Sequence, residues 1–578
     1  MKQSSIPSAR AVVSTFQSKG IKHIVISPGS RNAPLTISFT ENPTFKCFSI
    51  VDERCAAFFA LGMALRLKEP VAVLCTSGSA LLNYYPAVAE AFYSGIPLIV
   101  VSADRPPYKI DVGDGQTIRQ DNVFNRHIGY SANLKIDVEH AIERLKRYSP
   151  SLLEQPQENI NKFNAEELEK ALNCAIVKQL PVHVNVPFEE PLYDLISLEQ
   201  DEHKKVGAKT LLENELDDIT SFKELWNNSK KKMVLVGVNH PNELEQEQLE
   251  LLANDPSVIV FTETTSNLHH DNFFPSIDSI IFPIEKSQNS VQLFKQLQPE
   301  ILLTFGGLVV SKKIKAFLRQ YQPNHHWHID EVKAYDTYFS LSHHFKTNPN
   351  RFLKSLLSHE HPISNYFKNW NCIKIAYERK RAEYLEQIQF SDFSVFHSLA
   401  EIIPLGYQVH LANSSTVRYA QLFDMKPSLK VFCNRGTSGI DGSTSTAIGA
   451  SVANETPTLL ITGDLSFFYD SNALWNKYVR SDFRIIIINN SGGGIFRILP
   501  GNDDSEKFET FFETSHNLNA SHISKQYGFE YQNVNDEVSL QVALNSFYKI
   551  STSPKILEIF TPRKVNNKIL LAYFDFIS

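Results

Sequence analysis

The chain has 578 residues, of which 42% are hydrophobic and 21% charged, and its formal net charge is −6. This length exceeds what one hydrophobic core usually supports, so we expect about three domains. The mildly acidic balance argues against a protein that binds nucleic acid or an anionic membrane surface through a global positive field. Any anionic ligand must therefore be held by local Arg and Lys side chains.

The six cysteines are scattered, and no two of them have the spacing of zinc ligands. In a chain of this size, such a pattern indicates reduced, mostly buried thiols of a cytoplasmic protein. The N-terminal sequence lacks the uninterrupted apolar stretch of a signal peptide, and no run of about 18 apolar residues is present that could span a bilayer. We therefore expect a soluble, cytoplasmic protein.

From the N-terminus onward, short apolar runs alternate with longer amphipathic stretches. Four runs are predicted to be strands buried on both faces, at residues 23–27, 71–76, 97–103 and 181–188. Helices are predicted between them over 53–68 and 79–93, and the polar stretch 147–167 is predicted to be a loop. This strand–helix alternation is typical of a parallel sheet covered by helices.

The same pattern restarts twice. A second set of predicted strands covers residues 231–238, 257–263, 301–307 and 326–330. A third set covers residues 408–414, 430–434, 458–464, 483–490 and 555–561. Polar connectors over 190–225 and 345–390 separate the sets. The sequence therefore predicts an α/β protein with three consecutive domains of mainly parallel sheets flanked by helices, with bounds 1–190, 191–360 and 361–578.

The third set of strands contains a pattern that suits metal and phosphate binding. One apolar strand ends in Gly463-Asp464, and the next ends at Asn490, which glycines follow. Such strand ends share the sheet edge at which α/β proteins bind ligands. Mg²⁺ takes carboxylate and amide oxygens together with phosphate oxygens, and Ser466 can donate to a phosphate at the next helix start. Taken singly, Asp464 and Asn490 are more typical of surface turns.

Together, Asp464 and Asn490 resemble the signature of thiamine-diphosphate enzymes, Gly-Asp-Gly followed one βα unit later by Asn-Asn. Leu465 replaces the second glycine here, a departure found in some branches. In that superfamily a glutamate on another α/β domain activates the cofactor, which must lose its C2 proton. The candidate is Glu53, which follows a predicted strand over 48–51 and opens an apolar helix. Acidic residues also favour helix N-termini for electrostatic reasons alone, and only the agreement with the first motif favours a catalytic role.

Further motifs narrow the resemblance. They occur in order as SPGSRNAP (27–34), VDERCAAFFALGMA (51–64), CTSGSALLNYYPAVAEA (75–91), SADRPP (102–107), GQTIRQ (115–120) and NRGTSGIDGSTSTAIGA (434–450). They resemble the 2-succinyl-5-enolpyruvyl-6-hydroxy-3-cyclohexene-1-carboxylate (SEPHCHC) synthase family of menaquinone biosynthesis. The similarity spans all three predicted domains and is thin in the middle one. Acetolactate synthases and pyruvate oxidases share the architecture but not the pair formed by the first and last motifs.

The resemblance implies a transferase that removes CO₂ from 2-oxoglutarate and adds the remaining succinyl-semialdehyde carbanion equivalent to isochorismate by conjugate addition. Its cofactors would be thiamine diphosphate and Mg²⁺, for which Mn²⁺ can substitute. Both substrates are dianions at neutral pH, so the site needs guanidinium or ammonium groups. The family's substrate pocket corresponds to Ser30, Arg31, Gln116, Lys312, Lys313, Ser414, Arg418 and Arg435. Ser414 and Arg418 are four residues apart, so one helical turn places both on one face, whereas Lys312 and Lys313 are equally typical of an ordinary basic helix start.

The resemblance also implies a cofactor set and a metal set. The cofactor set is Glu53, Ser438, Gly439, Ile440, Gly463, Asp464, Leu465, Ser466, Asn490, Ile495 and Phe496, and the metal set is Asp464, Asn490 and Gly492. Ser438 and Gly439 are expected at the diphosphate, and Ile440 is expected to hold the cofactor in a bent form. Without the family match, Ile440, Ile495 and Phe496 would be interpreted as core residues. Residues 499–521 are a candidate lid.

In this superfamily the first domain of one chain faces the third domain of another, which implies a homodimer or a dimer of dimers. The expected partners are the small-molecule substrates, without nucleic acid or membrane. The nearest alternative is another enzyme of the same cofactor class, such as an acetolactate synthase or a 2-oxo-acid decarboxylase. The arginines of the substrate set favour multiply anionic substrates over pyruvate alone. An FAD-binding middle domain stays open, and a non-catalytic scaffold is disfavoured because the activating Glu and the Asp and Asn of the metal set are present.

Overall fold

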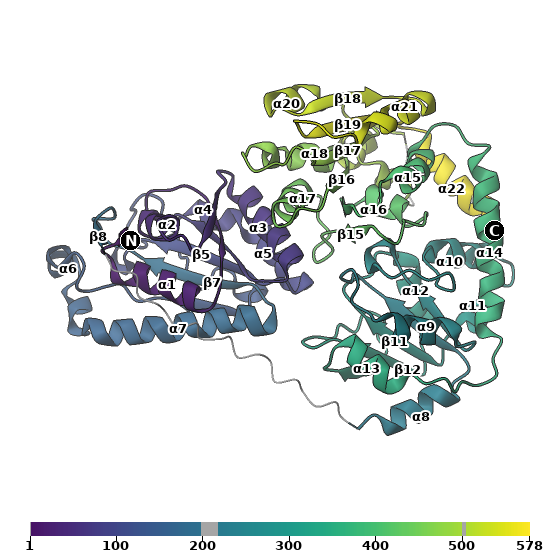
Figure 1. Ribbon diagram of the computed structural model, residues 1–578, viewed down its shortest axis with the longest axis horizontal. Coiled ribbons are helices and arrows are strands. Elements are labelled where there is room, and N and C mark those ends of the chain that lie inside the picture. The colour runs from purple at the N-terminus through teal and green to yellow at the C-terminus, as the bar shows by residue number, and fades with distance from the viewer. Residues whose placement is uncertain (1, 198–217, 500–503) are drawn as a thin grey trace. The chain divides into compact units, whose positions relative to one another are not determined.

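The computed structural model describes residues 2–197, 218–499 and 504–578 (Figure 1). Parts of the predicted connector over 190–225 and of the candidate lid over 499–521 lie outside these ranges. The chain forms two compact units, each assembled from separate stretches of sequence. Unit 1 comprises Met1–Leu212, Gly436–Glu455 and Tyr469–Arg480, and unit 2 comprises Glu213–Arg435, Thr456–Phe468 and Ser481–Ser578.

Unit 1 contains a six-stranded, all-parallel sheet with the order β3-β2-β4-β5-β7-β6. Its strands are β2 (His23–Ile26), β3 (Lys46–Ser49), β4 (Val71–Cys75), β5 (Leu98–Asp104), β6 (Tyr130–Asn133) and β7 (Val182–Pro187). The four strands predicted for the first set are all confirmed. β6 was not predicted, because its sequence YSAN is short and polar and lies at the sheet edge. A separate antiparallel pair joins β1 (Lys2–Ser4) to β8 (Leu195–Ser197).

Helices cover this sheet. Those from the first stretch of unit 1 are α1 (Pro7–Ser18), α2 (Ala33–Thr40), α3 (Glu53–Leu67), α4 (Ser79–Asn83), α5 (Tyr85–Ser94), α6 (Ile142–Tyr148) and α7 (Gln157–Lys178). The single helix predicted over 79–93 is wrong in one respect, since it is divided into α4 and α5. Pro86 stands at the start of α5, where its missing N–H cannot continue the hydrogen bonding of the preceding turn.

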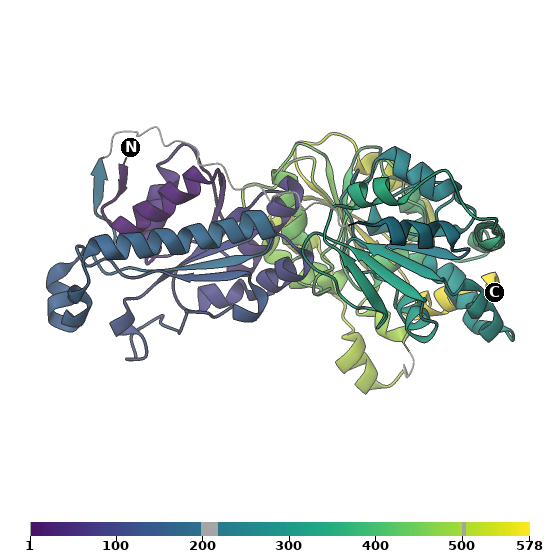
Figure 2. The same cartoon turned by 90° about the horizontal axis from the view of Figure 1, so that it is seen from below.

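The loop predicted over 147–167 is also wrong. This stretch contains the end of α6, a 3₁₀ turn (Pro150–Glu154) and the first half of α7, which runs along the sheet of unit 1 (Figure 2). Pro150 begins a helical turn instead of ending one, as prolines do at first-turn positions. The buried face of α7 includes Ile160, Leu168 and Leu172 at helical spacing, but the many polar residues between them obscure the periodicity.

Unit 2 contains two parallel sheets. The first has the order β10-β9-β11-β12-β13 and consists of β9 (Lys232–Val236), β10 (Val258–Phe261), β11 (Ile301–Phe305), β12 (His325–Ile329) and β13 (Leu341–Phe345). The second has the order β15-β14-β16-β17-β19-β18 and consists of β14 (Gln408–Leu411), β15 (Lys430–Phe432), β16 (Thr458–Gly463), β17 (Arg484–Asn489), β18 (Glu530–Val534) and β19 (Lys555–Phe560). All nine strands predicted for the second and third sets are confirmed, and the edge strands β13 and β18 are additional. The predicted α/β class, with mainly parallel sheets flanked by helices, is therefore confirmed in three parallel sheets.

The helices of the remaining chain are α8 (Thr220–Asn228), α9 (Gln246–Asn254), α10 (Ile277–Lys286), α11 (Ser290–Leu297), α12 (Lys312–Gln320), α13 (Pro349–Leu356), α14 (Tyr366–Leu385), α15 (Asp392–Ile402), α16 (Ser415–Ala420), α17 (Ser443–Val452), α18 (Asp464–Tyr469), α19 (Glu506–Phe508), α20 (Ser521–Gln526), α21 (Glu537–Phe547) and α22 (Asn566–Ile577). The predicted polar connector over 345–390 contains the two helices α13 and α14. The aromatic stripe Tyr366, Trp370 and Tyr377 is buried on one side of α14.

The two sheets of unit 2 share one continuous core. Buried residues from the first sheet, such as Met233 and Leu302, belong to the same apolar cluster as Val409 and Ile486 of the second. Asn267 adds a polar link, because its Nδ2 donates to the Val431 carbonyl at 2.9 Å and its Oδ1 accepts the Val431 N–H at 2.8 Å. The middle part of the chain is thereby fixed to the second sheet.

All six cysteines are free, and four of them are buried, as the sequence predicted. Burial raises the pKa of the Cys47 thiol to about 11, and it also raises the pKa values of Cys55 and Cys75. None of the helices in the described ranges combines the length and the apolar character that a bilayer crossing requires.

Within unit 1, α3 is the central helix, and the residues from Cys55 to Ala64 are all buried. A helix that is apolar on every side belongs in the interior of a protein. α17 packs directly against it, backbone to backbone. A Cβ on Gly62 would lie 2.0 Å from the Thr446 carbonyl oxygen, and a Cβ on Gly449 would lie 2.0 Å from the Phe59 carbonyl oxygen.

We expect Gly62→Ala to lower the free energy of unfolding by about 1 to 3 kcal/mol, because the added methyl group forces α3 and α17 apart. Urea unfolding followed by circular dichroism measures the change. Gly115→Ala is the matched control, since a Cβ at Gly115 meets no atom within 4 Å. Its stability should stay within about 0.5 kcal/mol of wild type. Equal stability of the two variants would contradict the proposed contact.

Candidate functional site

The three predicted metal ligands lie together at one edge of the second sheet of unit 2. Asp464 follows β16 and Asn490 follows β17, and these strands are parallel neighbours. The Gly492 N–H donates to Asp464 Oδ2 at 2.9 Å, while the Leu465 N–H donates to Oδ1 at 2.7 Å. The Asp464 and Asn490 side chains are both buried.

This donor set fits a hard divalent cation. It offers a carboxylate, an amide oxygen and a backbone carbonyl, which are oxygen ligands of the kind Mg²⁺ accepts. Gly492 has φ +145°, and a Cβ there would lie 2.7 Å from the Glu513 carbonyl oxygen, so only glycine allows this turn. Among the described residues, no cluster of three or more His, Cys, Asp and Glu side chains offers a different metal site.

One histidine that was not predicted lies beside this site. His516 Nε2 is 3.3 Å from Asp464 Oδ2, and the imidazole ring makes an edge contact with Phe468 at a centroid distance of 5.7 Å. His516 belongs to no motif, so the sequence carried no signal for its proximity to Asp464. It adds a nitrogen donor next to the carboxylate that is expected to bind the metal.

The predicted cofactor residues of unit 2 surround this edge. Gly463 ends β16, Leu465 and Ser466 lie in the first turn of α18, and Ser466 is buried. Ile495 and Phe496 lie on a 3₁₀ turn (Gly494–Arg497) that follows β17. Phe496 is 38% exposed, so the alternative interpretation as a core residue is wrong for it.

The described part of the candidate lid is anchored next to Gly492. α19 continues into a π-helical turn (Glu509–Glu513), and together they form the short helical segment that projects from unit 2 in Figure 2. Glu513 accepts from Arg497 Nη2 at 2.6 Å and from Arg563 Nη2 at 2.5 Å, and its carbonyl accepts the Gly493 N–H at 2.6 Å. These bonds fix the base of the segment to the turn that carries the metal ligand, and lid closure stays a prediction.

Two predicted substrate residues of unit 2, the half-buried Arg418 and the buried Arg435, form a pair of cations. Arg418, in the last turn of α16, donates through Nη1 to the Ser414 carbonyl at 2.6 Å, and Arg435 Nη1 donates to Asn413 Oδ1 at 2.6 Å. The one-turn relation between Ser414 and Arg418 is therefore confirmed. Burial lowers the pKa of Arg418, and repulsion from Arg435 lowers it further. A bound anion would stabilise two neighbouring positive charges of this kind, because it offsets their mutual repulsion.

α12 contributes further cations. Lys313 is paired with Glu285 and lies 4.4 Å from the Phe282 ring centroid, while Lys312 is exposed at the first position of the helix. Lys315 was not predicted, although it lies three residues beyond Lys312 on the same face. Burial lowers the pKa of Lys315, the carboxylate of Glu263 opposes this shift, and repulsion from Arg435 lowers the pKa further.

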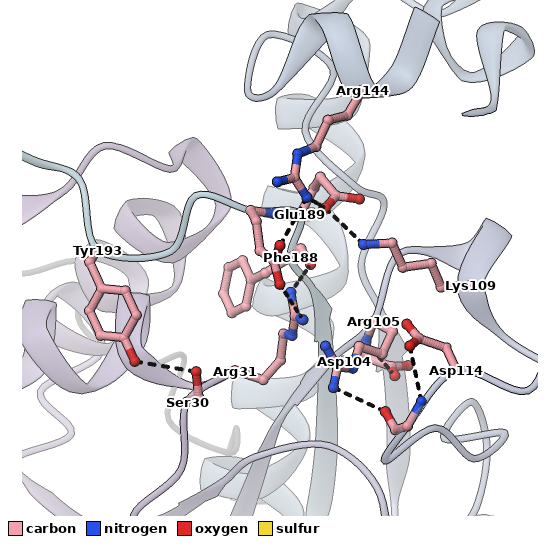
Figure 3. A network of polar contacts seen from close by, with 12 residues as sticks. Ser30, Arg31, Asp104, Arg105, Lys109, Asp114, Arg144, Phe188, Glu189 and Tyr193 are labelled. Carbon is pink, nitrogen blue, oxygen red and sulfur yellow. Dashed lines mark hydrogen bonds and ion pairs between the residues drawn. The ribbon is translucent and has the colours of Figure 1, made fainter. Parts of the chain in front are cut away.

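In unit 1, Ser30 and Arg31 follow β2 (Figure 3). The Ser30 hydroxyl is 3.2 Å from the Tyr193 hydroxyl. Arg31 is buried, and its guanidinium group donates to the Phe188 carbonyl at 3.1 Å and to Glu190 Oε1 at 3.2 Å. Among the described residues, Arg31 Nε has no hydrogen-bond partner.

The other predicted substrate residue of unit 1 lies in an exposed turn. Gln116 has φ +54°, and the preceding Gly115 carbonyl accepts from Arg105 Nη2 at 3.0 Å (Figure 3). Arg105 was not selected from the sequence, although it lies within the motif SADRPP. It adds a second guanidinium group to this part of unit 1.

Glu53 is the first residue of α3, but it is not the cap. The side chain of Asp52 accepts the Cys55 N–H at 3.0 Å and thereby caps the helix. The alternative explanation, that an acidic residue occurs here because it stabilises the N-terminus of the helix, therefore applies to Asp52. In the part of the chain that the structure describes, the Glu53 carboxylate forms no hydrogen bond or ion pair, so it is available for another role.

The loop that carries Ser438, Gly439 and Ile440 is held by a carboxylate that was not predicted. Glu90 of α5 is 1% exposed and accepts the Gly436 N–H and the Thr437 N–H, both at 2.7 Å. It also accepts the Thr437 hydroxyl at 2.9 Å. Ile440 is 37% exposed, so the core interpretation is wrong for it as well.

We expect Glu90→Ala to increase amide hydrogen exchange in the 436–440 loop, because two backbone N–H groups lose their acceptor. Leaving them unsatisfied should also lower the free energy of unfolding by about 1 to 3 kcal/mol. Hydrogen-exchange mass spectrometry and urea unfolding measure these effects. Glu158→Ala, at an exposed position of α7, is the control and should change neither. Unchanged exchange in the Glu90 variant would contradict the anchoring role.

Comparison with known proteins agrees with this arrangement. Residues 8–125 match the N-terminal TPP binding domain of thiamine pyrophosphate enzymes, residues 205–411 match their middle domain, and residues 413–559 match their C-terminal TPP binding domain.

Curated relatives match along nearly the whole chain. A protein of Christiangramia forsetii is 55% identical over 100% of both chains, and one of Flavobacterium johnsoniae is 52% identical over 98% of both. One of Porphyromonas gingivalis is 37% identical over 97% of this chain and 96% of its own. Each bears the name 2-succinyl-5-enolpyruvyl-6-hydroxy-3-cyclohexene-1-carboxylate synthase. The chain therefore belongs to the thiamine pyrophosphate enzymes and, within them, to the SEPHCHC synthase family.

Proposed function

We propose that this protein removes CO₂ from 2-oxoglutarate and adds the remaining four-carbon unit to isochorismate by conjugate addition, giving SEPHCHC and CO₂ in menaquinone biosynthesis. The observation that carries the proposal is the pair Arg418 and Arg435, of which Arg435 is buried and Arg418 half-buried, in the same unit as the oxygen-ligand set at Asp464. Two dianionic substrates require such groups, whereas pyruvate alone requires fewer. Relatives with this printed name, matched over the full chain, support it.

The cofactor, when bound, would supply a nucleophilic carbon for the 2-oxo group and an electron-withdrawing ring that takes up the electron pair left by CO₂. Asp464, Asn490 and the Gly492 carbonyl would hold Mg²⁺, or Mn²⁺ in its place, against the diphosphate. Ser438, Gly439 and Ser466 would donate to phosphate oxygens, and Gly463 and Leu465 would lie along the cofactor. Ile440, Ile495 and Phe496 would pack against its rings, which is consistent with the exposure of Ile440 and Phe496.

Glu53 would hold and release a proton at the aminopyrimidine ring. Its freedom from the capping role, which Asp52 performs, supports this assignment. The substrate carboxylates would be bound by Ser30, Arg31 and Gln116 of unit 1 and by Lys312, Lys313, Ser414, Arg418 and Arg435 of unit 2. Exclusion of water from these groups would protect the reacting carbon from protonation.

We further propose three domains with bounds 1–190, 191–360 and 361–578, which supply the activating glutamate, the central cations and the metal site respectively. The working assembly would be a homodimer or a dimer of dimers located in the cytoplasm. The six free cysteines agree with a reducing compartment.

The assay that tests the function contains purified protein, thiamine diphosphate, Mg²⁺, 2-oxoglutarate and isochorismate. We expect isochorismate to be consumed only when all components are present, and mass spectrometry should identify SEPHCHC. Pyruvate should not replace 2-oxoglutarate, because it lacks the second carboxylate. If 2-oxoglutarate or pyruvate loses CO₂ while isochorismate is untouched, the acceptor assignment is wrong and a decarboxylase of the same cofactor class is favoured.

A mixture of two inactive variants tests both Glu53 and the assembly. Glu53→Gln and Asp464→Ala should each abolish turnover when assayed alone. If each active site combines Glu53 of one chain with Asp464 of another, every mixed dimer contains one intact site. Unfolding and refolding an equal mixture should then restore about a quarter of wild-type activity, because about half of the dimers are mixed. No recovery would contradict sites shared between chains, and activity of Glu53→Gln alone would contradict its role.

A further inference from the structure

We infer that Asp392 is a positioning residue that orients the amide of Asn490 so that its oxygen, not its nitrogen, faces the metal ion. The inference rests on the proposed function, since the metal ion belongs to that proposal. It concerns a residue outside the sequence signature of the cofactor site. Asp392 reaches Asn490 from α15, which begins with this residue.

Three hydrogen bonds fix Asp392, two of them at its carboxylate. Its Oδ2 accepts from Asn490 Nδ2 at 3.0 Å, and its Oδ1 accepts the Thr561 hydroxyl at 2.6 Å. Its own backbone N–H donates to Asn566 Oδ1 at 2.9 Å, at the start of α22. Asp392 is 2% exposed, so this carboxylate has exchanged its hydration for these contacts.

The helix start that carries Asp392 is itself well defined. Ser391 accepts the Ser394 N–H, while the Ser394 hydroxyl accepts the Ser391 N–H at 3.0 Å, which forms a capping box. Asn566 Nδ2 also donates to the Thr561 hydroxyl at 3.2 Å. The position of the carboxylate is therefore determined by α15, by the end of β19 and by α22.

This contact decides which end of the Asn490 amide is available. An ionised carboxylate only accepts hydrogen bonds, so it selects the Nδ2 group of a neighbouring asparagine. The amide oxygen then lies at the opposite branch of the side chain and is left for another partner. With the amide reversed, two N–H groups would face a cation, and no coordination could form.

The amide of the neighbouring Asn489 is also oriented by a carboxylate. Asn489 Nδ2 donates to Glu558 Oε1 at 2.7 Å, and Asn489 Oδ1 accepts the Ser491 N–H at 3.0 Å. Asp392 and Glu558 therefore hold the two amides of the Asn-Asn pair separately.

Water has little room to replace the carboxylate. A cavity of about 10 Å³ lies next to it, lined by Asp392, Asn490, Gly494, Arg497, Arg563 and Asn566 among others. This volume is at the lower limit of what a single water molecule occupies. A substitution at Asp392 therefore changes the acceptor for Asn490 directly, with room for at most about one water molecule beside it.

The test is the affinity for Mn²⁺ in the presence of saturating thiamine diphosphate, measured by the electron paramagnetic resonance signal of free Mn²⁺. Asp392→Asn keeps the shape of the side chain but can present either an amide nitrogen or an oxygen to Asn490. We expect the Kd for Mn²⁺ to rise about 10- to 100-fold, the range typical of residues that orient metal ligands. Circular dichroism and urea unfolding confirm that the variant is folded.

The matched control is Asp137→Asn in unit 1. Asp137 is also a buried carboxylate that accepts two hydrogen bonds, from the Ser8 N–H at 3.0 Å and from Gln157 Nε2 at 2.8 Å. Its substitution should leave the Kd for Mn²⁺ unchanged. Asn490→Ala should weaken binding at least as much as Asp392→Asn. Adding Asp392→Asn to Asn490→Ala should raise the Kd for Mn²⁺ little further, because Asp392 acts only through Asn490.

The possible results separate the inference from the function on which it rests. If wild-type protein binds no Mn²⁺ with the cofactor present, the proposed metal site fails. If wild type binds Mn²⁺ and Asp392→Asn binds it equally well, the metal site stands and the positioning role is refuted. Independent, additive losses in the double variant would likewise refute a role that acts through Asn490.

Discussion

The hydrogen bond from the Gly492 N–H to Asp464 is the constraint on which the candidate metal site depends. It joins the ends of two parallel strands, β16 and β17, so that a carboxylate and a glycine turn lie within 2.9 Å of each other. The turn is possible because Gly492 has φ +145°. The next residue, Gly493, donates to the Glu513 carbonyl, and the Glu513 carboxylate is paired with Arg497 and Arg563. The glycine turn at the sheet edge is thus connected through Glu513 to a cluster of ion pairs.

Buried carboxylates perform the same task at three places. Glu90 holds the 436–440 loop, Asp392 orients Asn490, and Glu558 accepts from Asn489, the Ala520 N–H and the Tyr531 hydroxyl. A buried charge is costly unless hydrogen bonds replace its hydration, and each of these groups has several donors. A loop that must leave space for a ligand cannot be fixed by apolar packing alone. Hydrogen bonds to a buried carboxylate can fix such a loop instead, because they are directional.

Much of the fold could be predicted because buried parallel strands are continuous apolar runs, as β9 and β17 are. The edge strands β6 and β18 were missed because they are polar. Each has a partner strand on one side only, so its sequence does not have to be a continuous apolar run. Helix α7 was missed because its few apolar positions are separated by many polar ones. Motifs located Asp464, Asn490 and Glu53, whereas Asp392 and Lys315 are ordinary residues in sequence. Their importance comes from contacts with residues far away along the chain, which no local pattern encodes.

The crossing of α3 and α17 has a consequence for how this chain can change over generations. At most crowded positions in a core, a larger residue on one helix can be offset by a smaller residue on the other. At Gly62 and Gly449 the obstacle is the carbonyl oxygen of the facing helix, 2.0 Å from the position of any Cβ. Main-chain atoms are common to every amino acid, so no second substitution in the partner helix can make room. A substitution of either glycine therefore cannot be compensated by a substitution in the facing helix. Each position must remain glycine, whatever residue occupies the other.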